Sequence, residues 1–210
     1  MMWVMMARME QTITTRGNGS AYAAPDAMRL SVSVVNREST VSLALAATAR
    51  GVATAGEVAR KHTESTQISS SGLSVWPDQD KGGRRADFQA RHSLQIYCPG
   101  LDSAGDLVTA LAEALGSAIQ VDHIELVITD PGPLETAARK DAFHDARAKA
   151  EELAALADLT LGGAVAVVEG GGSEGLGLVR MLAASGGDST RFEAGSQAVS
   201  ASVTVSWSAR

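Results

Sequence analysis

The strict alternation of apolar and hydroxyl side chains near the C-terminal end restricts the fold more than any other feature of this 210-residue chain. Between residues 199 and 207, Val, Ala or Trp occupies every odd position, and Ser or Thr occupies every even position. A repeat of two places successive side chains on opposite faces of a strand. We therefore expect a β-strand with one face on a core and the other facing water or a partner.

A second periodicity predicts a long helix over residues 134–158. One stripe of mostly small side chains recurs every three or four residues, at Ala138, Ala142, Ala146, Ala150, Leu153 and Ala157. Small residues on this stripe allow the helix to lie close to a sheet. Glu135 with Arg139, and Asp145 with Lys149, form i,i+4 pairs in the favourable order, each contributing about 0.2–0.5 kcal/mol.

The remaining periodicities predict a mixture of strands and helices. Runs of apolar and β-branched residues indicate strands at residues 13–20, 30–34, 67–77, 86–98, 121–129 and 164–168, the first with a glycine break. Alternation is clear at 30–34 and 121–129 and imperfect around Arg91 and His92. Three-to-four-residue spacing indicates helices at 39–63, which Ser39 or Thr40 could cap, and at 101–115. Strands and helices do not alternate regularly, so we expect an α+β fold with antiparallel or mixed sheets packed against two or three long amphipathic helices.

The expected organisation is one main domain. Residues 1–11 are expected to be a disordered or extended N-terminal segment, and residues 12–210 a single α+β domain, with two subdomains as the alternative. Residues 170–196 are rich in glycine and are predicted to form a flexible insertion.

Composition argues against several classes of function. The net charge of −6 disfavours binding to nucleic acid, and the densest basic run, Lys81, Arg84, Arg85 and Arg91, is predicted to be a solvated hairpin tip.

Cys98 is the sole cysteine, so no intramolecular disulfide can form, and we expect a half-buried free thiol.

The N-terminal segment does not predict a membrane anchor. Arg8 and Glu10 interrupt its apolar run, and no run in the chain approaches the roughly 20 residues that a spanning helix needs. We expect a cytoplasmic protein without a membrane span. A periplasmic or secreted location is the alternative if the natural N-terminus differs, for example if translation begins at Met9.

Three stretches resemble the SIMPL-domain family, which includes bacterial periplasmic immunogenic proteins and a mammalian kinase-associated adaptor. These are GNGSAYAAPDAMRLSVSVV at residues 17–35, the Ala-rich helix and following strand at 137–169, and FEAGSQAVSASVTVSW at 192–207. Their order and spacing carry the resemblance. It implies an α+β fold, self-association in some bacterial members, and no established catalytic residues.

Candidate chemical sites are weak. The loop Gly170–Gly175 fits G-x-G-x-x-G after a strand, but too little chain follows to complete a dinucleotide-binding unit, and Asp188 and Glu193 lie in loop sequence. The four histidines, His62, His92, His123 and His144, show no metal-ligand spacing. The serines at 69–71 have no evident base, and neighbouring Glu151 and Glu152 point to different helix sides. We therefore assign no catalytic, cofactor-binding or metal-binding residue, and expect no cofactor.

The leading hypothesis is a non-enzymatic interaction or self-assembly protein that forms a homo-oligomer, with a protein partner as a further expectation. Two alternatives stay open. One is a small-molecule or nucleotide-binding module that uses the loop at residues 170–175, and the other is an adaptor that binds extended peptides at a sheet edge. The polar final strand could provide such an edge, although a central position for this strand is favoured.

Overall fold

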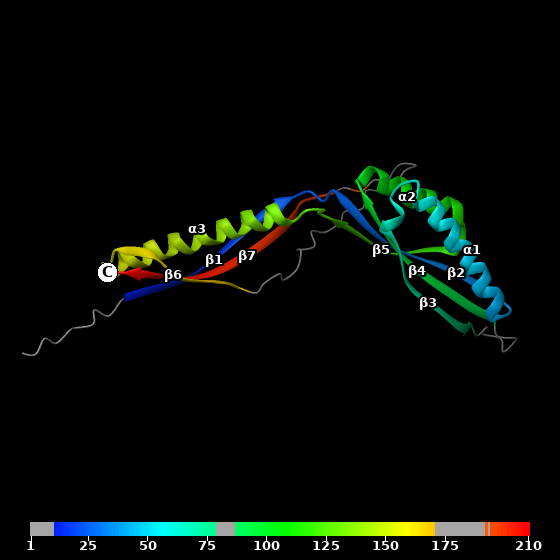
Figure 1. Cartoon of the computed structure of the whole chain (residues 1–210), viewed down its shortest axis with the longest axis horizontal. Coiled ribbons are helices and arrows are strands. Elements are labelled where there is room, and N and C mark those ends of the chain that lie inside the picture. Colours follow the sequence, from blue (N-terminus) through cyan, green and yellow to red (C-terminus); the bar gives the residue numbers. More distant parts are fainter. Residues whose placement is uncertain (1–10, 79–86, 171–191, 193) are drawn as a thin grey trace, which may run out of the picture. The chain divides into compact units, whose positions relative to one another are not determined.

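The computed structural model describes residues 11–78, 87–170, 192 and 194–210. Within these residues the chain forms three α-helices and seven strands in two antiparallel sheets, so the predicted α+β class is confirmed (Figure 1). The chain divides into two compact units, each with its own sheet and its own helices. None of the helices in this described part is long and apolar enough to cross a membrane.

One unit contains a four-stranded sheet covered on one face by two helices. The strand order is β3-β4-β2-β5, with β2 at Ala27–Glu38, β3 at Ile68–Asp78, β4 at Asp87–Pro99 and β5 at Ile119–Val127. Helices α1, Val41–Ala59, and α2, Leu101–Leu115, both contact β2 and β4. The short 3₁₀ turns Ser65–Gln67 and Gly116–Ala118 lead into β3 and β5.

Alternation along β2 places the core of this unit beneath the helices. Met28, Leu30, Val32 and Val34 are fully buried and pack with residues of β4, α1 and α2. The intervening residues face the side of the sheet opposite the helices, where most side chains are polar. Helix α1 begins where the sequence predicts, because the Thr40 hydroxyl accepts a hydrogen bond from the Leu43 N–H.

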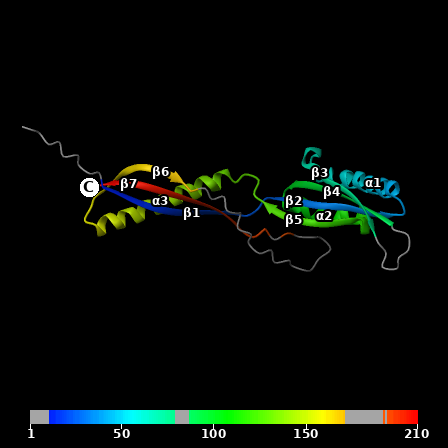
Figure 2. The same cartoon turned by 90° about the horizontal axis from the view of Figure 1, so that it is seen from below.

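The other unit contains a three-stranded sheet and the longest helix. The strand order is β1-β7-β6, with β1 at Gln11–Ala23, β6 at Leu161–Glu169 and β7 at Gln197–Ala209. Helix α3, Gly132–Leu156, packs along β1 and β7 (Figure 2). Its buried stripe is Ala138, Ala142, Ala146, Ala150 and Ala154, so the stripe continues at Ala154 and the prediction of Leu153 and Ala157 is wrong.

Close approach of α3 to β1 explains the glycines of the first strand. A Cβ added to Gly17 would lie 1.9 Å from the carbonyl oxygen of Ala142, and one on Gly19 would lie 2.2 Å from that of Ala138. The predicted glycine break is therefore wrong, because β1 pairs continuously with β7 from Gln11 to Ala23. The two glycines give α3 the space to lie against the strand.

Two predicted segments lie mostly outside the described residues. The N-terminal segment is described only at Gln11, which begins β1, and the glycine-rich insertion is described only at Gly170, Phe192 and residues 194–196. Of the predicted basic tip, only Arg91 is described. It lies in β4, where its guanidinium pairs with Asp122, so its assignment to a solvated turn is wrong.

Candidate functional site: the free edge of β6

The two sheets have four outer strands, β1 and β6 in one and β3 and β5 in the other. An outer strand presents unpaired N–H and C=O groups that another strand can use, and natural proteins usually cover or interrupt such edges. The four outer strands of this protein differ in how they do so. The difference identifies one edge as a candidate interaction site.

The edge of β1 is covered by an ion pair of α3. The Asp145 carboxylate accepts a hydrogen bond of 2.8 Å from the Asn18 N–H, and the Lys149 ammonium donates one of 3.2 Å to the Arg16 carbonyl. Lys149 Nζ lies 2.6 Å from Asp145 Oδ2. The Lys149 hydrogen bond and then the Asn18 N–H lower the pKa of Asp145. The Arg16 carbonyl and the Asn18 N–H, in the middle of β1, are thus already used.

The edges of β3 and β5 are interrupted in the backbone. The pairing of β3 with β4 shifts register between Ser70 and Gly72, and Pro77 removes an N–H near the end of β3. The pairing of β5 with β2 shifts opposite Ser31 and Val32, which leaves Asp122 as the extra residue of a bulge. Both features weaken these edges as templates for a further strand.

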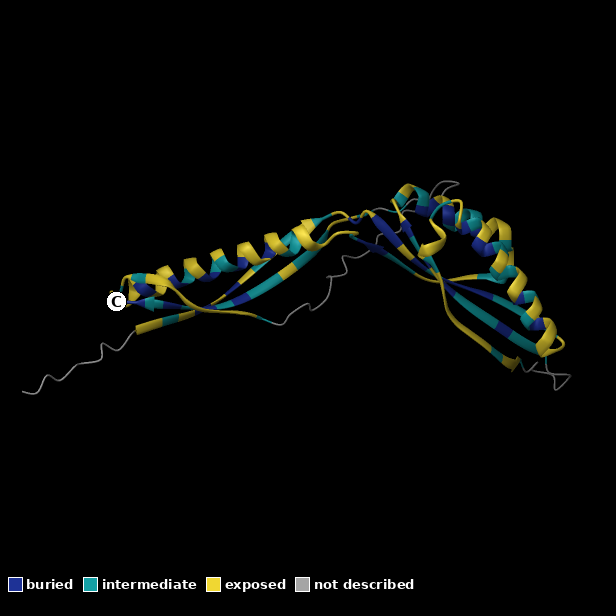
Figure 3. Ribbon diagram, viewed as in Figure 1, coloured by how far each residue is buried: buried dark blue, intermediate teal, exposed yellow. Residues whose placement is uncertain are grey.

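By contrast, β6 is open and apolar. Its sequence LGGAVAVVE has no proline and no lysine, and Val165, Val167 and Val168 are 57%, 54% and 62% exposed. Figure 3 shows an almost continuous run of exposed residues along this strand. Among the described residues, no strand pairs with its outer side, and α3 makes little contact with it.

Backbone geometry shows which groups of β6 point outward. The Gly170 N–H donates to the Ser202 carbonyl, and the register with β7 is unbroken from Ala166 to Glu169. Because hydrogen-bonding direction alternates along an antiparallel strand, Val168 also directs its N–H and C=O toward β7. Val167 and Glu169 therefore direct theirs outward. Register shifts between Leu161 and Ala166 make the first half of the strand less regular.

The single charge of β6 is neutralised from α3. The Arg139 guanidinium donates from Nε to Glu169 at 2.6 Å and from Nη2 to Glu135 at 3.2 Å. Hydrogen bonding to Glu169 is the main cause that raises the pKa of Arg139. The Glu135–Arg139 pair is the one that the sequence predicts, whereas the contact with Glu169 depends on the return of the chain beside α3. As a result, β6 offers an edge without an uncompensated charge.

A sequence comparison identifies the family of this chain. The model of the SIMPL family, described as a protein of unknown function, matches residues 13–207. The chain belongs to the SIMPL family. No curated protein matches the chain in a sequence search. The resemblance stated from three short stretches is thereby confirmed, and the SIMPL match extends from β1 to β7 through both compact units.

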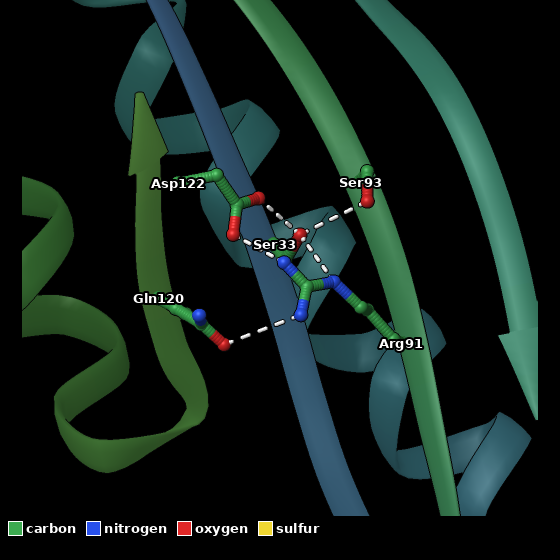
Figure 4. A network of polar contacts seen from close by, with 5 residues as sticks. All are labelled: Ser33, Arg91, Ser93, Gln120 and Asp122. Atoms are coloured by element: carbon green, nitrogen blue, oxygen red, sulfur yellow. Dashed lines mark hydrogen bonds and ion pairs between the residues drawn. The ribbon is translucent and has the colours of Figure 1, made fainter. Parts of the chain in front are cut away.

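In this SIMPL protein the richest polar cluster spans β5, β2 and β4 (Figure 4). The fully buried Ser33 hydroxyl contacts Asp122 and Ser93 and accepts a 2.9 Å hydrogen bond from Arg91 Nε. Arg91 also pairs with Asp122 and lies 3.4 Å from Gln120 Oε1. Ser33 is buried and the Asp122 carboxylate is paired with Arg91. This geometry therefore favours a structural role, in which the cluster links three strands, over a nucleophilic centre.

The residues that sequence analysis weighed as chemical groups are dispersed. His92 contacts the Ser70 hydroxyl at 2.8 Å, whereas His123 and His144 are exposed on β5 and α3. No group of three or more His, Cys, Asp or Glu able to hold a metal occurs in the part of the chain that the structure describes. Cys98 is buried in the four-stranded unit, and burial raises the pKa of its thiol. Of the loop Gly170–Gly175, only Gly170 is described, and the rest of that candidate lies outside the described residues, as do Asp188 and Glu193.

The final strand is the centre of its sheet. β7 pairs with β1 on one side and with β6 on the other, so the favoured central position is correct and the strand has no free edge. Its hydroxyl side chains contact neighbouring strands, as in the 2.8 Å hydrogen bond between Thr14 and Ser206. The sequence pattern drew the prediction of an interaction edge to β7, and the edge of β6 was not predicted. The signal for β6 is a run that is apolar on both faces and has neither lysine nor proline.

Proposed function

We propose that this SIMPL protein is a non-enzymatic interaction protein that binds an extended strand at the free edge of β6. One observation carries the proposal: from Ala166 to Glu169, after the register shifts in its first half, β6 keeps an unbroken register with β7 and presents an exposed apolar edge that contains no proline and has no partner strand among the described residues. Its exposed valines supply apolar surface, and its outward backbone groups supply hydrogen bonds. Together these are the elements of recognition by strand addition.

The polar groups of the described residues support an interaction role over a catalytic one. The largest cluster, around Ser33 and Arg91, satisfies its own hydrogen bonds, and these bonds join serine, arginine, aspartate and glutamine side chains, whereas His92 contacts Ser70. The nucleotide-binding alternative depends on residues 171–175 and stays a prediction. The cytoplasmic location also stays a prediction, with the periplasmic or secreted alternative.

A binding assay with paired proline variants tests the proposal. The probe is a fluorescent peptide of residues 161–170 with two added lysines for solubility, titrated with the full chain and followed by anisotropy. Val167→Pro removes an outward N–H, so it should leave the sheet intact and weaken peptide binding at least tenfold. Val168→Pro removes an N–H that faces β7, so it should destabilise the three-stranded unit instead.

Hydrogen exchange supplies an independent readout. Peptide binding should slow exchange of the Val167 and Glu169 amides, which face outward, and leave the Val168 amide as protected as before. Equal peptide affinity for wild type and Val167→Pro would refute the proposal. So would saturable binding that leaves the outward amides unprotected, because the peptide would then occupy another surface.

A further inference from the structure

The two outer strands of the three-stranded sheet have opposite properties. The Arg16 carbonyl and the Asn18 N–H of β1 are taken by Lys149 and Asp145, whereas the outward groups of β6 at Val167 and Glu169 have no partner strand among the described residues. A unit with one closed edge and one open edge can accept a single neighbouring sheet. This asymmetry restricts the assembly that strand addition can produce.

We propose that the strand bound at β6 is β6 of a second copy of this chain, paired antiparallel about a two-fold axis. This inference rests on the proposed function of the β6 edge. The result would be a continuous six-stranded sheet of order β1-β7-β6-β6-β7-β1. A two-fold pair uses the same patch on both copies, so each surface must be complementary to itself.

Side-chain size and charge support an antiparallel pair. A parallel, in-register pair would place Glu169 beside Glu169 of the second copy, which is unfavourable for like charges. An antiparallel pair separates these two residues. Because Arg139 neutralises Glu169 within each copy, the pair needs no charge from elsewhere.

The register that we infer places Ala166 on the two-fold axis. Counted along the chain, Val165 of one copy then lies opposite Val167 of the other, and Glu169 lies opposite Gly163, with residues 163–165 in the part of β6 where the register with β7 shifts. A Cβ at Gly163 would meet nothing within 4 Å, so this position leaves room for the ion pair of Glu169 with Arg139. With the axis at Val165, Glu169 would lie opposite Leu161, and with the axis at Val167 it would lie opposite Val165. Both residues have larger side chains than Gly163 and leave less space for the ion pair.

Assembly at this edge should stop at two copies. In the six-stranded sheet the outer strands are both β1, and Asp145 and Lys149 occupy the Asn18 N–H and the Arg16 carbonyl in the middle of each outer edge. Such edges resist addition of a further strand. The expected species is therefore a discrete dimer, and not a filament that grows with concentration.

Light scattering on a sizing column over a dilution series tests the stoichiometry. The wild-type chain should show a mass twice its 21.7 kDa, falling to 21.7 kDa on dilution. Val167→Lys should be monomeric throughout that series. The matched control is Val121→Lys, which places a lysine on the exposed side of the β5 edge, where valine is 45% exposed, and should leave the dimer unchanged. Far-UV circular dichroism checks that both variants fold.

Cysteine cross-linking tests the register independently of Val167. In a Cys98→Ala background, Ala166→Cys should form an intermolecular disulfide, because a non-hydrogen-bonded antiparallel pair brings Cα atoms to about 4.5 Å. The control Ala164→Cys should not, since its copy lies about four residues further along, at roughly 13 Å.

The outcomes separate this inference from the proposed function. A chain that is monomeric at every concentration but still binds the β6 peptide refutes the dimer and leaves strand addition standing. Species larger than two copies refute the closed assembly. Cross-linking at residue 164 as efficient as at residue 166 refutes the register, and failure of both peptide binding and dimerisation refutes the proposed function itself.

Discussion

Replacing Gly17 by alanine should destabilise the three-stranded unit strongly, because the backbone of α3 occupies the space that the new methyl group requires. The added Cβ would lie 1.9 Å from the Ala142 carbonyl oxygen and 2.5 Å from the Ala146 N–H nitrogen. Real Cβ atoms essentially never approach closer than 3.0 Å, so the helix or strand must move by at least 1.1 Å, the difference between the two distances. Both obstructing atoms are backbone, and no side-chain rotation relieves the contact.

The shift separates α3 from its core. Ala142 and Ala146 pack with Val205 and Trp207, and a gap of this size forfeits a large part of their dispersion energy. Overpacking of a tight core costs about 1–3 kcal/mol, and a rigid obstruction places Gly17→Ala near the upper end, at about 3 kcal/mol. With a urea m value of about 2 kcal/mol per molar, the midpoint should fall by about 1.5 M.

The assay is a urea titration followed by the fluorescence of Trp207, in a background where Trp3 and Trp76 are phenylalanine. Trp207 is 3% exposed in the core of this unit, so its emission reports unfolding there. The matched control is Gly163→Ala, the same change in a strand of the same sheet, where a Cβ meets nothing within 4 Å and the midpoint should move by less than about 0.3 M. Equal shifts for the two variants would refute the role assigned to Gly17.

Three further perturbations give distinct expected results. Thr15→Val should cost about 2–3 kcal/mol in urea unfolding. Thr15 Oγ1 accepts a hydrogen bond from Trp207 Nε1 at 3.1 Å and donates one to the Ala146 carbonyl at 2.7 Å, so valine leaves the buried indole N–H unpaired and removes the additional hydrogen bond of that helical carbonyl. Full stability in Thr15→Ser and Thr15→Val alike would contradict this. Cys98 is buried and the pKa of its thiol is raised, so it should react with a disulfide reagent only as fast as the protein unfolds. Stopped-flow experiments in increasing urea can compare the labelling rate with the unfolding rate. Asp145 has a lowered pKa in the folded state, so its contribution to stability is fully present above the unfolded pKa near 3.8 and is lost as pH falls through the folded pKa. The wild-type protein should therefore have a higher melting temperature than Asp145→Asn at neutral pH. A difference in melting temperature that does not close in acid would be inconsistent with this assignment.

Local sequence patterns were sufficient to predict the elements of this fold. Every strand and α-helix in the described residues overlaps a predicted one, and α2 spans the predicted residues 101–115. The errors arise where a distant segment changes the meaning of a local signal. Gly17 and Gly19 are typical of a break, but in β1 they accommodate α3, which follows more than a hundred residues later. Arg91 is typical of a solvated tip, but Asp122 holds it on the sheet.

Sheet order was not accessible from the sequence for the same reason. Which strand becomes central depends on pairings between residues far apart, such as Gln11 with Ala209 and Leu161 with Ala209. The i,i+4 pair of Asp145 with Lys149 was predicted as a local contribution to the helix. Its contact with the outward backbone groups of β1 depends on how close α3 lies to that strand, and this contact is what closes the edge.

The strand with the most regular alternation, β7, is not the strand that we expect to associate, which is β6. Regular alternation, as in β7, means that one face is covered and the other is wet, and a central strand meets that condition without a partner. A run that is apolar on both faces, as in β6, is typical of strands buried on both sides, yet α3 leaves β6 largely uncovered and its three valines are more than half exposed. Exposed apolar surface of this kind marks an interaction site more often than a tolerated defect. The mismatch between the pattern of β6 and its exposure is therefore the physical reason to look for its partner along that edge.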